Sequence, residues 1–239
     1  MIRNAVPLLL LAAVGTVGAQ ELEIPDVPTP LLPERAATVE AFVPKGWTVE
    51  ERLTGPVDAD AKPDVVLLLR DADPRNVLHN EGLGVPELDT NPRVLLVLLA
   101  DPAGGWRRVA QSDTVIRRND IPTLSDAYED GGLTLDKRVL GVTVGFFANA
   151  GSWTASHTTY KFRWQDGCMR LIGFDEGVLN RGSGETTDTS VNLLTRKATR
   201  AIGNMEVDGA VQHRYALKPR APVCLEVVND EFDPGIPAD

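Results

Sequence analysis

Apolar and polar positions along the chain follow the pattern of β-strands. Residues 47–53 carry apolar side chains at positions 47, 49 and 53, close to the alternation of a strand with one buried face. Residues 65–69 and 94–99 are apolar throughout, short and flanked by turn residues, which favours central strands over buried helices. Residues 106–116 predict a further strand, and the polar residues 117–132 predict a loop.

The C-terminal half predicts a β-meander. Residues 140–147, 154–164 and 169–174 alternate between apolar and polar positions, and Asp166 and Gly167 form a strong hairpin signal between the last two. Residues 190–202 fit one more hairpin. The expected fold is therefore mainly β, with antiparallel sheets in a propeller-blade-like or sandwich-like meander and one or two short helices.

The N-terminus has the composition of a signal peptide. Arg3 precedes an apolar run, and small residues at Val17, Gly18 and Ala19 suit a cleavage point, so residues 1–19 are the expected leader. The alternative is a retained membrane anchor, but the run is shorter than the roughly 20 residues of a spanning helix. We expect a periplasmic or secreted protein with no membrane span after cleavage.

The remaining chain divides by composition into three parts. Residues 20–35 hold four prolines and predict a linker. Residues 36–228 predict a single β-rich domain that begins with a short helix near residues 36–42. Residues 229–239 predict an acidic, loosely attached tail.

The net charge bears on possible partners, and the two cysteines bear on a disulfide and on redox chemistry. The formal net charge is −10, and no basic cluster with interleaved aromatic residues offsets it, which argues against nucleic acid as a partner. In an oxidising compartment Cys168 and Cys224 are expected to form a disulfide; the alternative is two buried thiols too far apart to meet. Because no Cys-x-x-Cys pair is present, a catalytic redox role is not expected.

Three aspartates have the spacing of a calcium loop. Asp58, Asp60 and Asp64 stand two and then four residues apart, directly before an apolar strand. Pro56 occupies the first ligand position but has no side-chain oxygen to bind an ion. Ala61 stands where glycine normally permits the sharp turn. The aspartates are thus a degenerate, weak calcium candidate, and no other cofactor is expected. The alternative is a solvated acidic turn.

The loop also carries a family resemblance. Gly55-x-Val-Asp58-x-Asp60-x-Lys62-Pro63-Asp64-Val-Val resembles the FG-GAP/VCBS-like repeat of integrin-like β-propellers. Two later blocks, residues 152–175 and residues 184–195, look like those of small exported bacterial proteins of unassigned function that carry a single such loop. The resemblance spans residues 42–227. It implies a secreted, β-rich protein and no particular reaction.

Few residues offer catalytic chemistry. The three histidines stand far apart and lack metal-binding spacing. His157, on a predicted strand, and the acidic group of Asp126, Glu129 and Asp130, in a predicted loop, are candidates for a hydrolase, as are the three aspartates of the calcium-like loop. The alternative is that all of these are ordinary solvated side chains.

Aromatic residues on one predicted strand allow two interpretations. Tyr160, Phe162 and Trp164 recur at every second position, with Trp153 just before them. Such a row is mostly core, and the functional alternative is a platform for a glycan or peptide.

Together these features favour an exported, non-enzymatic β-domain that binds a protein or another envelope component. A periplasmic or extracellular hydrolase is the second hypothesis. The third is an inhibitor or immunity protein that inserts a loop, such as the glycine- and serine-containing residues 176–187, into its target.

Overall fold

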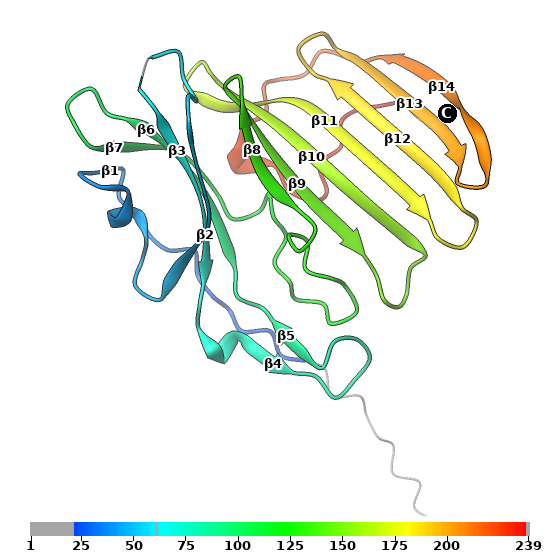
Figure 1. Ribbon diagram of the computed structural model, residues 1–239, viewed down its shortest axis with the longest axis horizontal. Helices are drawn as coiled ribbons and strands as arrows, with labels where there is room; N and C mark the ends of the chain where they lie inside the picture. The colour runs from blue at the N-terminus through cyan, green and yellow to red at the C-terminus, as the bar shows by residue number, and fades with distance from the viewer. Residues whose placement is uncertain (1–21, 61, 238–239) are drawn as a thin grey trace, which may run out of the picture.

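Two antiparallel sheets and a small hairpin make up this computed structural model, which describes residues 22–60 and 62–237 (Figure 1). The expected signal peptide, residues 1–19, lies outside the described residues. The five-stranded sheet has the order β1-β7-β6-β3-β2. Its strands are β1 (Arg35–Ala36), β2 (Trp47–Gly55), β3 (Asp64–Asp71), β6 (Arg93–Ala100) and β7 (Trp106–Ser112).

The seven-stranded sheet is a meander in chain order from β8 to β14. Its strands are β8 (Gly132–Asp136), β9 (Val139–Phe147), β10 (Thr154–Gln165), β11 (Cys168–Asn180), β12 (Glu185–Asn192), β13 (Lys197–Asn204) and β14 (Val207–Ala216). The separate hairpin joins β4 (Val77–His79) to β5 (Glu87–Asp89). The expected mainly β fold with antiparallel sheets is confirmed.

Helical structure in the described residues is limited to short 3-10 turns: η1 (Val39–Phe42), η2 (Pro74–Asn76) and η3 (Leu225–Val227). No helix within residues 22–60 and 62–237 is long and apolar enough to cross a membrane. The short helix expected near residues 36–42 is therefore a single turn, and Ala36 belongs to β1 because it pairs with Trp106.

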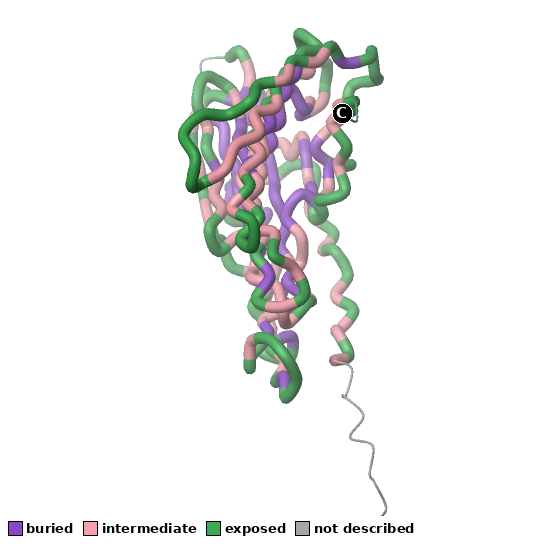
Figure 2. Tube along the Cα trace, turned by 90° about the vertical axis from the view of Figure 1, so that its right-hand side faces the viewer, coloured by how far each residue is buried: buried purple, intermediate pink, exposed green. Residues whose placement is uncertain are grey.

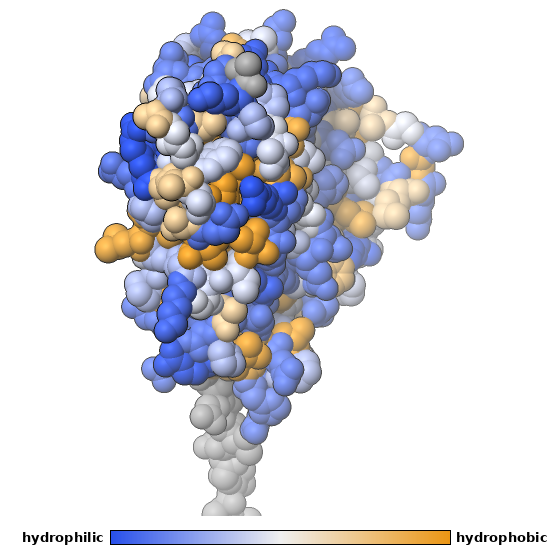
Figure 3. All heavy atoms as spheres, turned by 60° about the vertical axis from the view of Figure 1, so that its left-hand side comes forward, coloured by the Kyte–Doolittle hydropathy of each residue, from blue (hydrophilic) through white to orange (hydrophobic). Residues whose placement is uncertain are grey.

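The central strands of the five-stranded sheet, β3 and β6, are buried on both faces, as their apolar runs predict. Val66 and Leu68 of β3 pack into the core shared with the seven-stranded sheet. Val65 and Leu67 point the other way and pack against Val39 and other residues near η1. Buried positions accordingly run through the interior between these layers (Figure 2), while hydrophilic residues cover most of the face drawn in Figure 3, with some hydrophobic residues near its middle.

The C-terminal segment completes the core on the inner face of the seven-stranded sheet, behind it in Figure 1. The ring of Phe232 lies 6.3 Å from that of Tyr160 and 6.0 Å from that of Phe174. Tyr160 Oη donates to the carbonyl of Asn229, and Leu225 is fully buried. The expectation of a loosely attached tail is wrong for this part, because Phe232 gains more by burial than the segment loses in freedom.

The N-terminal segment also lies against the domain. Arg118 Nη1 donates to the carbonyl of Pro25 at 2.8 Å, and Arg108 Nη2 donates to that of Leu32 at 3.3 Å. The proline-rich stretch thus supplies backbone carbonyl acceptors to arginines of the folded domain.

The disulfide between Cys168 and Cys224 is confirmed, with a Cα–Cα distance of 5.8 Å. It ties the segment before η3 to the first residue of β11, next to the bridge between Arg170 and Cys224. The covalent link therefore holds the covering segment on the sheet.

Two boundaries differ from expectation, and one turn is confirmed. Residues 176–187 are not a loop: β11 continues to Asn180 and β12 begins at Glu185, leaving a turn of residues 181–184. The strand expected over residues 106–116 ends at Ser112. The turn at Asp166 and Gly167 is confirmed, with φ of 53° and 79°.

Candidate functional site

The carboxylates of the calcium-like loop accept hydrogen bonds from backbone amides. Asp64 is fully buried; its Oδ2 accepts from the amides of Val57 at 2.7 Å and Asp58 at 3.2 Å, and its Oδ1 accepts from the amide of Ala100 at 3.0 Å. Asp58 in turn accepts from the amide of Asp60 at 2.8 Å. These aspartates therefore shape the turn and fasten it to β6.

Their arrangement bears on metal binding. No group of three or more acidic, histidine or cysteine side chains within the described residues is placed to hold a metal ion. Weak calcium binding by Asp58, Asp60 and Asp64 stays a prediction, which calorimetry with millimolar calcium tests.

We expect Asp64→Asn to lower the free energy of unfolding by about 2 kcal/mol, because the amide nitrogen of asparagine leaves buried N–H donors without an acceptor. Urea denaturation with and without calcium measures the loss. Asp60→Asn is the matched control, since Asp60 is exposed, and it should change stability by less than about 0.5 kcal/mol. Equal losses in both variants would contradict the role given to Asp64.

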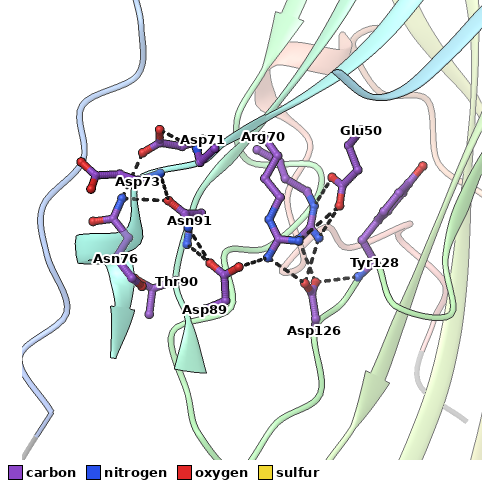
Figure 4. Close-up of polar contacts among 12 residues, drawn as sticks. Glu50, Arg70, Asp71, Asp73, Asn76, Asp89, Thr90, Asn91, Asp126 and Tyr128 are labelled. Atoms are coloured by element: carbon purple, nitrogen blue, oxygen red, sulfur yellow. Dashed lines mark hydrogen bonds and ion pairs between the residues drawn. The ribbon is translucent and has the colours of Figure 1, made fainter. Parts of the chain in front are cut away.

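The acidic loop expected to serve a hydrolase is tied to the five-stranded sheet by Arg93 (Figure 4). The Arg93 side chain is only 5% exposed. Its Nε and Nη2 contact the carboxylate of Glu50 at 2.6 and 2.9 Å, and its Nη1 and Nη2 contact that of Asp126 at 2.8 Å each. Both carboxylates are thus bound in the bidentate manner that suits a guanidinium.

A second arginine borders the same carboxylates. Arg70 Nη2 lies 2.9 Å from Asp89 and 3.8 Å from Asp126. Burial raises the pKa of Asp126, but the hydrogen bonds from Arg93 and the Tyr128 amide outweigh it and hold that pKa below its usual range. Asp126 therefore stays ionised, but it is a poor general base because its lowered pKa makes it a weak base and Arg93 occupies both of its oxygens.

Tyr128 extends this network. Its hydroxyl donates to Glu51, and the Arg93 guanidinium lies 5.4 Å from the centre of its ring. Burial and the bond to Glu51 raise the pKa of Tyr128. The network therefore fastens the loop before β8 to β2 and β6, and its chemistry is structural.

A different surface gathers groups that are free to meet a ligand. Since Tyr160 of β10 faces the core, the residues that alternate with it face outward. His157 is one of them, and it pairs with Gly145 on β9 and with Gly177 on β11. The histidine thus stands between two glycines on the outer face of the seven-stranded sheet.

The imidazole uses the space that Gly177 leaves. A Cβ atom built on Gly177 would lie 2.4 Å from Cε1 of His157, well inside contact distance. The ring therefore rests on the backbone of β11, and its position depends on the absence of a side chain there.

A cavity of about 570 Å³ opens over this part of the outer face, which we call the outer groove. It spans β9 to β12 and the loop before β8, and its lining includes Asp130, Phe147, His157, Leu179 and Asp188. Neither Asp130 nor Asp188 has an ion-pair or hydrogen-bond partner among the described residues. The groove thus combines an apolar wall with two unpaired carboxylates.

One end of the outer groove is fixed by Arg181. Its guanidinium lies 4.1 Å from the centre of the Phe147 ring, and its Nη2 donates to the carbonyls of Ala148 and Ser152 at 2.5 and 2.9 Å. Trp153, which is 69% exposed, follows Ser152. The aromatic wall is therefore held in place before any ligand arrives.

The aromatic row on β10 is core. Tyr160 and Phe162 are buried, and Trp164 packs partly against the same cluster, so the platform interpretation is wrong for these three. Only Trp153 of the four predicted aromatics is among the strongly exposed residues.

Sequence reasoning found part of the outer groove. The structure brings Asp126, Asp130 and His157 into one lining, but Glu129 is not part of it. Phe147, Leu179 and Asp188 were missed. Glycines at alternating positions of β9 and β11 were the available signal, because a strand face without side chains leaves room above the sheet.

No protein-family model matches this chain, and searches of curated proteins and of solved structures likewise find no match.

Proposed function

We propose that this chain is an exported, non-enzymatic binding protein whose outer groove receives a positively charged segment of a partner protein or envelope component. The observation that carries the proposal is the groove itself. It combines a prepared apolar wall, Phe147 and Leu179, with the unpaired carboxylates Asp130 and Asp188. An extended segment with a lysine or arginine beside an apolar residue complements both features.

Export is supported by two independent features. The disulfide between Cys168 and Cys224 belongs to an oxidising compartment, and residues 1–19 have the composition of a leader. The resemblance to exported FG-GAP/VCBS-like proteins agrees with this location and supplies no reaction.

We expect Asp130→Asn with Asp188→Asn to weaken binding of the envelope partner by about tenfold, because both variants remove attraction while keeping side-chain shape. A photo-reactive residue at position 179 first cross-links the partner in envelope extract, so that the partner can be recovered. Titration of that partner against each variant then measures the dissociation constant. The control is Asp136→Asn with Asp166→Asn, two exposed carboxylates outside the groove lining with the same change in charge. Equal binding by both double variants would reject the groove as the site.

A hydrolase remains the second candidate, and one observation favours it: Asp130 and His157 share the groove lining. A panel of ester, peptide and glycoside substrates tests it, with His157→Ala and Asp130→Asn as variants. Turnover that either variant abolishes would replace the binding proposal.

The inhibitor hypothesis relied on residues 176–187 as an inserting loop. The turn of residues 181–184 is short, and Arg181 within it is bound to neighbouring carbonyls. This segment therefore gives the hypothesis no support.

A further inference from the structure

The last strand of the seven-stranded sheet, β14, presents an edge that no described strand pairs with. In Figure 2, which looks from the β14 side, exposed positions follow this side of the molecule. Val207 and Val211 are 67% and 64% exposed. An exposed edge of this length offers unpaired N–H and C=O groups to another strand.

Three of the other edges in the two large sheets are covered or short. β8, at the opposite end of the same sheet, and β2, at one edge of the five-stranded sheet, lie beside each other, and the side chain of Leu135 fills the space above Gly55. β1, at the edge of the five-stranded sheet, has only two residues. By contrast β14 has ten residues and contains neither lysine nor proline, the residues that most often block edge pairing.

The charges of β14 select one way for the strand to pair with itself. Its sequence, VDGAVQHRYA, contains two charged residues, Asp208 and Arg214, of opposite sign. They stand three residues on either side of Val211. Antiparallel pairing about Val211 therefore places Asp208 of each copy opposite Arg214 of the other, and no other symmetric register does so.

The irregular part of the strand includes Asp208 and Gly209, which have no partner on β13, so the ladder itself extends from Ala210 onward. The pairing of β13 with β14 shifts between Gly203 and Asn204, opposite Asp208 and Gly209, and Gly209 has a φ of 96°. The regular ladder with β13 begins at Ala210, so the residues beside the twofold axis are in plain strand geometry. The bulge lies at the outer end, where the charged side chains meet.

We propose that β14 is a self-association edge: two copies of this chain pair antiparallel through β14 about Val211, which joins their seven-stranded sheets into one. The apolar contact at the axis is Val211 with its symmetry mate, and two Asp208–Arg214 pairs flank it. Such an interface is small, so association in the micromolar range is expected. The outer groove, on β9 to β12, is left open on both copies.

Analytical ultracentrifugation of the mature chain from about 1 to 500 µM tests the proposal, because interfaces of this size associate within that range. The expected result is a monomer–dimer equilibrium. Asp208→Arg and Arg214→Asp should each weaken it by at least about tenfold, since each places like charges opposite. The double variant restores the opposite pairs and should dimerise as the original chain does. Asp136→Arg is the control for net charge.

Cross-linking tests the register separately. Val211→Cys should form a disulfide between copies under mild oxidation, because Val211 faces its own symmetry mate. Gln212→Cys should not, since it faces Ala210 of the second copy. Both native cysteines are already paired, so neither competes. A chain that stays monomeric at the highest concentration, or a dimer indifferent to both single charge changes, would overturn the proposal.

Discussion

Arg93→Met is expected to lower the free energy of unfolding by about 3 kcal/mol at neutral pH, because it leaves two partly buried carboxylates, Glu50 and Asp126, without their shared cation. The Arg93 guanidinium makes bidentate contacts with Glu50 and Asp126. Methionine keeps much of the side-chain volume, so the loss reflects charge and hydrogen bonds. Urea denaturation at pH 7 measures it. Arg75→Met is the control, since the Arg75 side chain is 88% exposed and its replacement should leave the free energy of unfolding almost unchanged.

The loss of stability caused by Arg93→Met should depend on pH in a defined direction. Because the folded-state pKa of Asp126 is lowered, its contribution to stability is present above the unfolded pKa and is lost as pH falls through the folded pKa. Acid therefore destabilises the original chain through this group. In Arg93→Met the carboxylate has lost its partner, so protonation relieves the defect. The difference in stability between the two proteins should shrink from pH 7 toward pH 3; a constant difference would contradict the ion-pair explanation.

Cys168→Ser with Cys224→Ser is expected to lower the free energy of unfolding by roughly 4 kcal/mol, because the bridge joins residues 56 positions apart and restricts the unfolded chain. The bridge also holds the segment that carries Leu225 and Phe232 onto the core. Denaturation of the original protein with and without reductant measures the loss. The double variant should be insensitive to reductant. Two titratable thiols in the unfolded, unreduced protein would show that the bridge is absent.

Strands that have a long apolar run of their own could be predicted from the sequence. The apolar runs of β3 and β6 predict burial on both faces, and each run forms the expected central strand. β14 could not be predicted in the same way. Its residues are mostly polar and include Gly209, so it forms a strand because β13 offers an edge to pair with. Propensity is weak evidence where pairing decides the structure.

The candidate site likewise depends on contacts between distant segments, which the sequence does not show. The spacing of Asp58, Asp60 and Asp64 predicts a turn correctly, but a sequence cannot show that Asp64 also accepts from Ala100 on another strand. Likewise His157 and Asp188 share the groove lining only because the register of β10 to β12 places both beside Gly177. A shift of one residue would turn His157 toward the core.

The covering segment at residues 223–236 has a consequence for biogenesis. It is synthesised after all of the strands, yet it supplies Leu225, Val228 and Phe232 to the core they share. A nascent chain that has made only the strands still lacks this cover over Tyr160 and Phe174, so it cannot settle into its final packing. We therefore expect complete packing only after this segment has been made, with the disulfide between Cys168 and Cys224 then fixing it on the sheet.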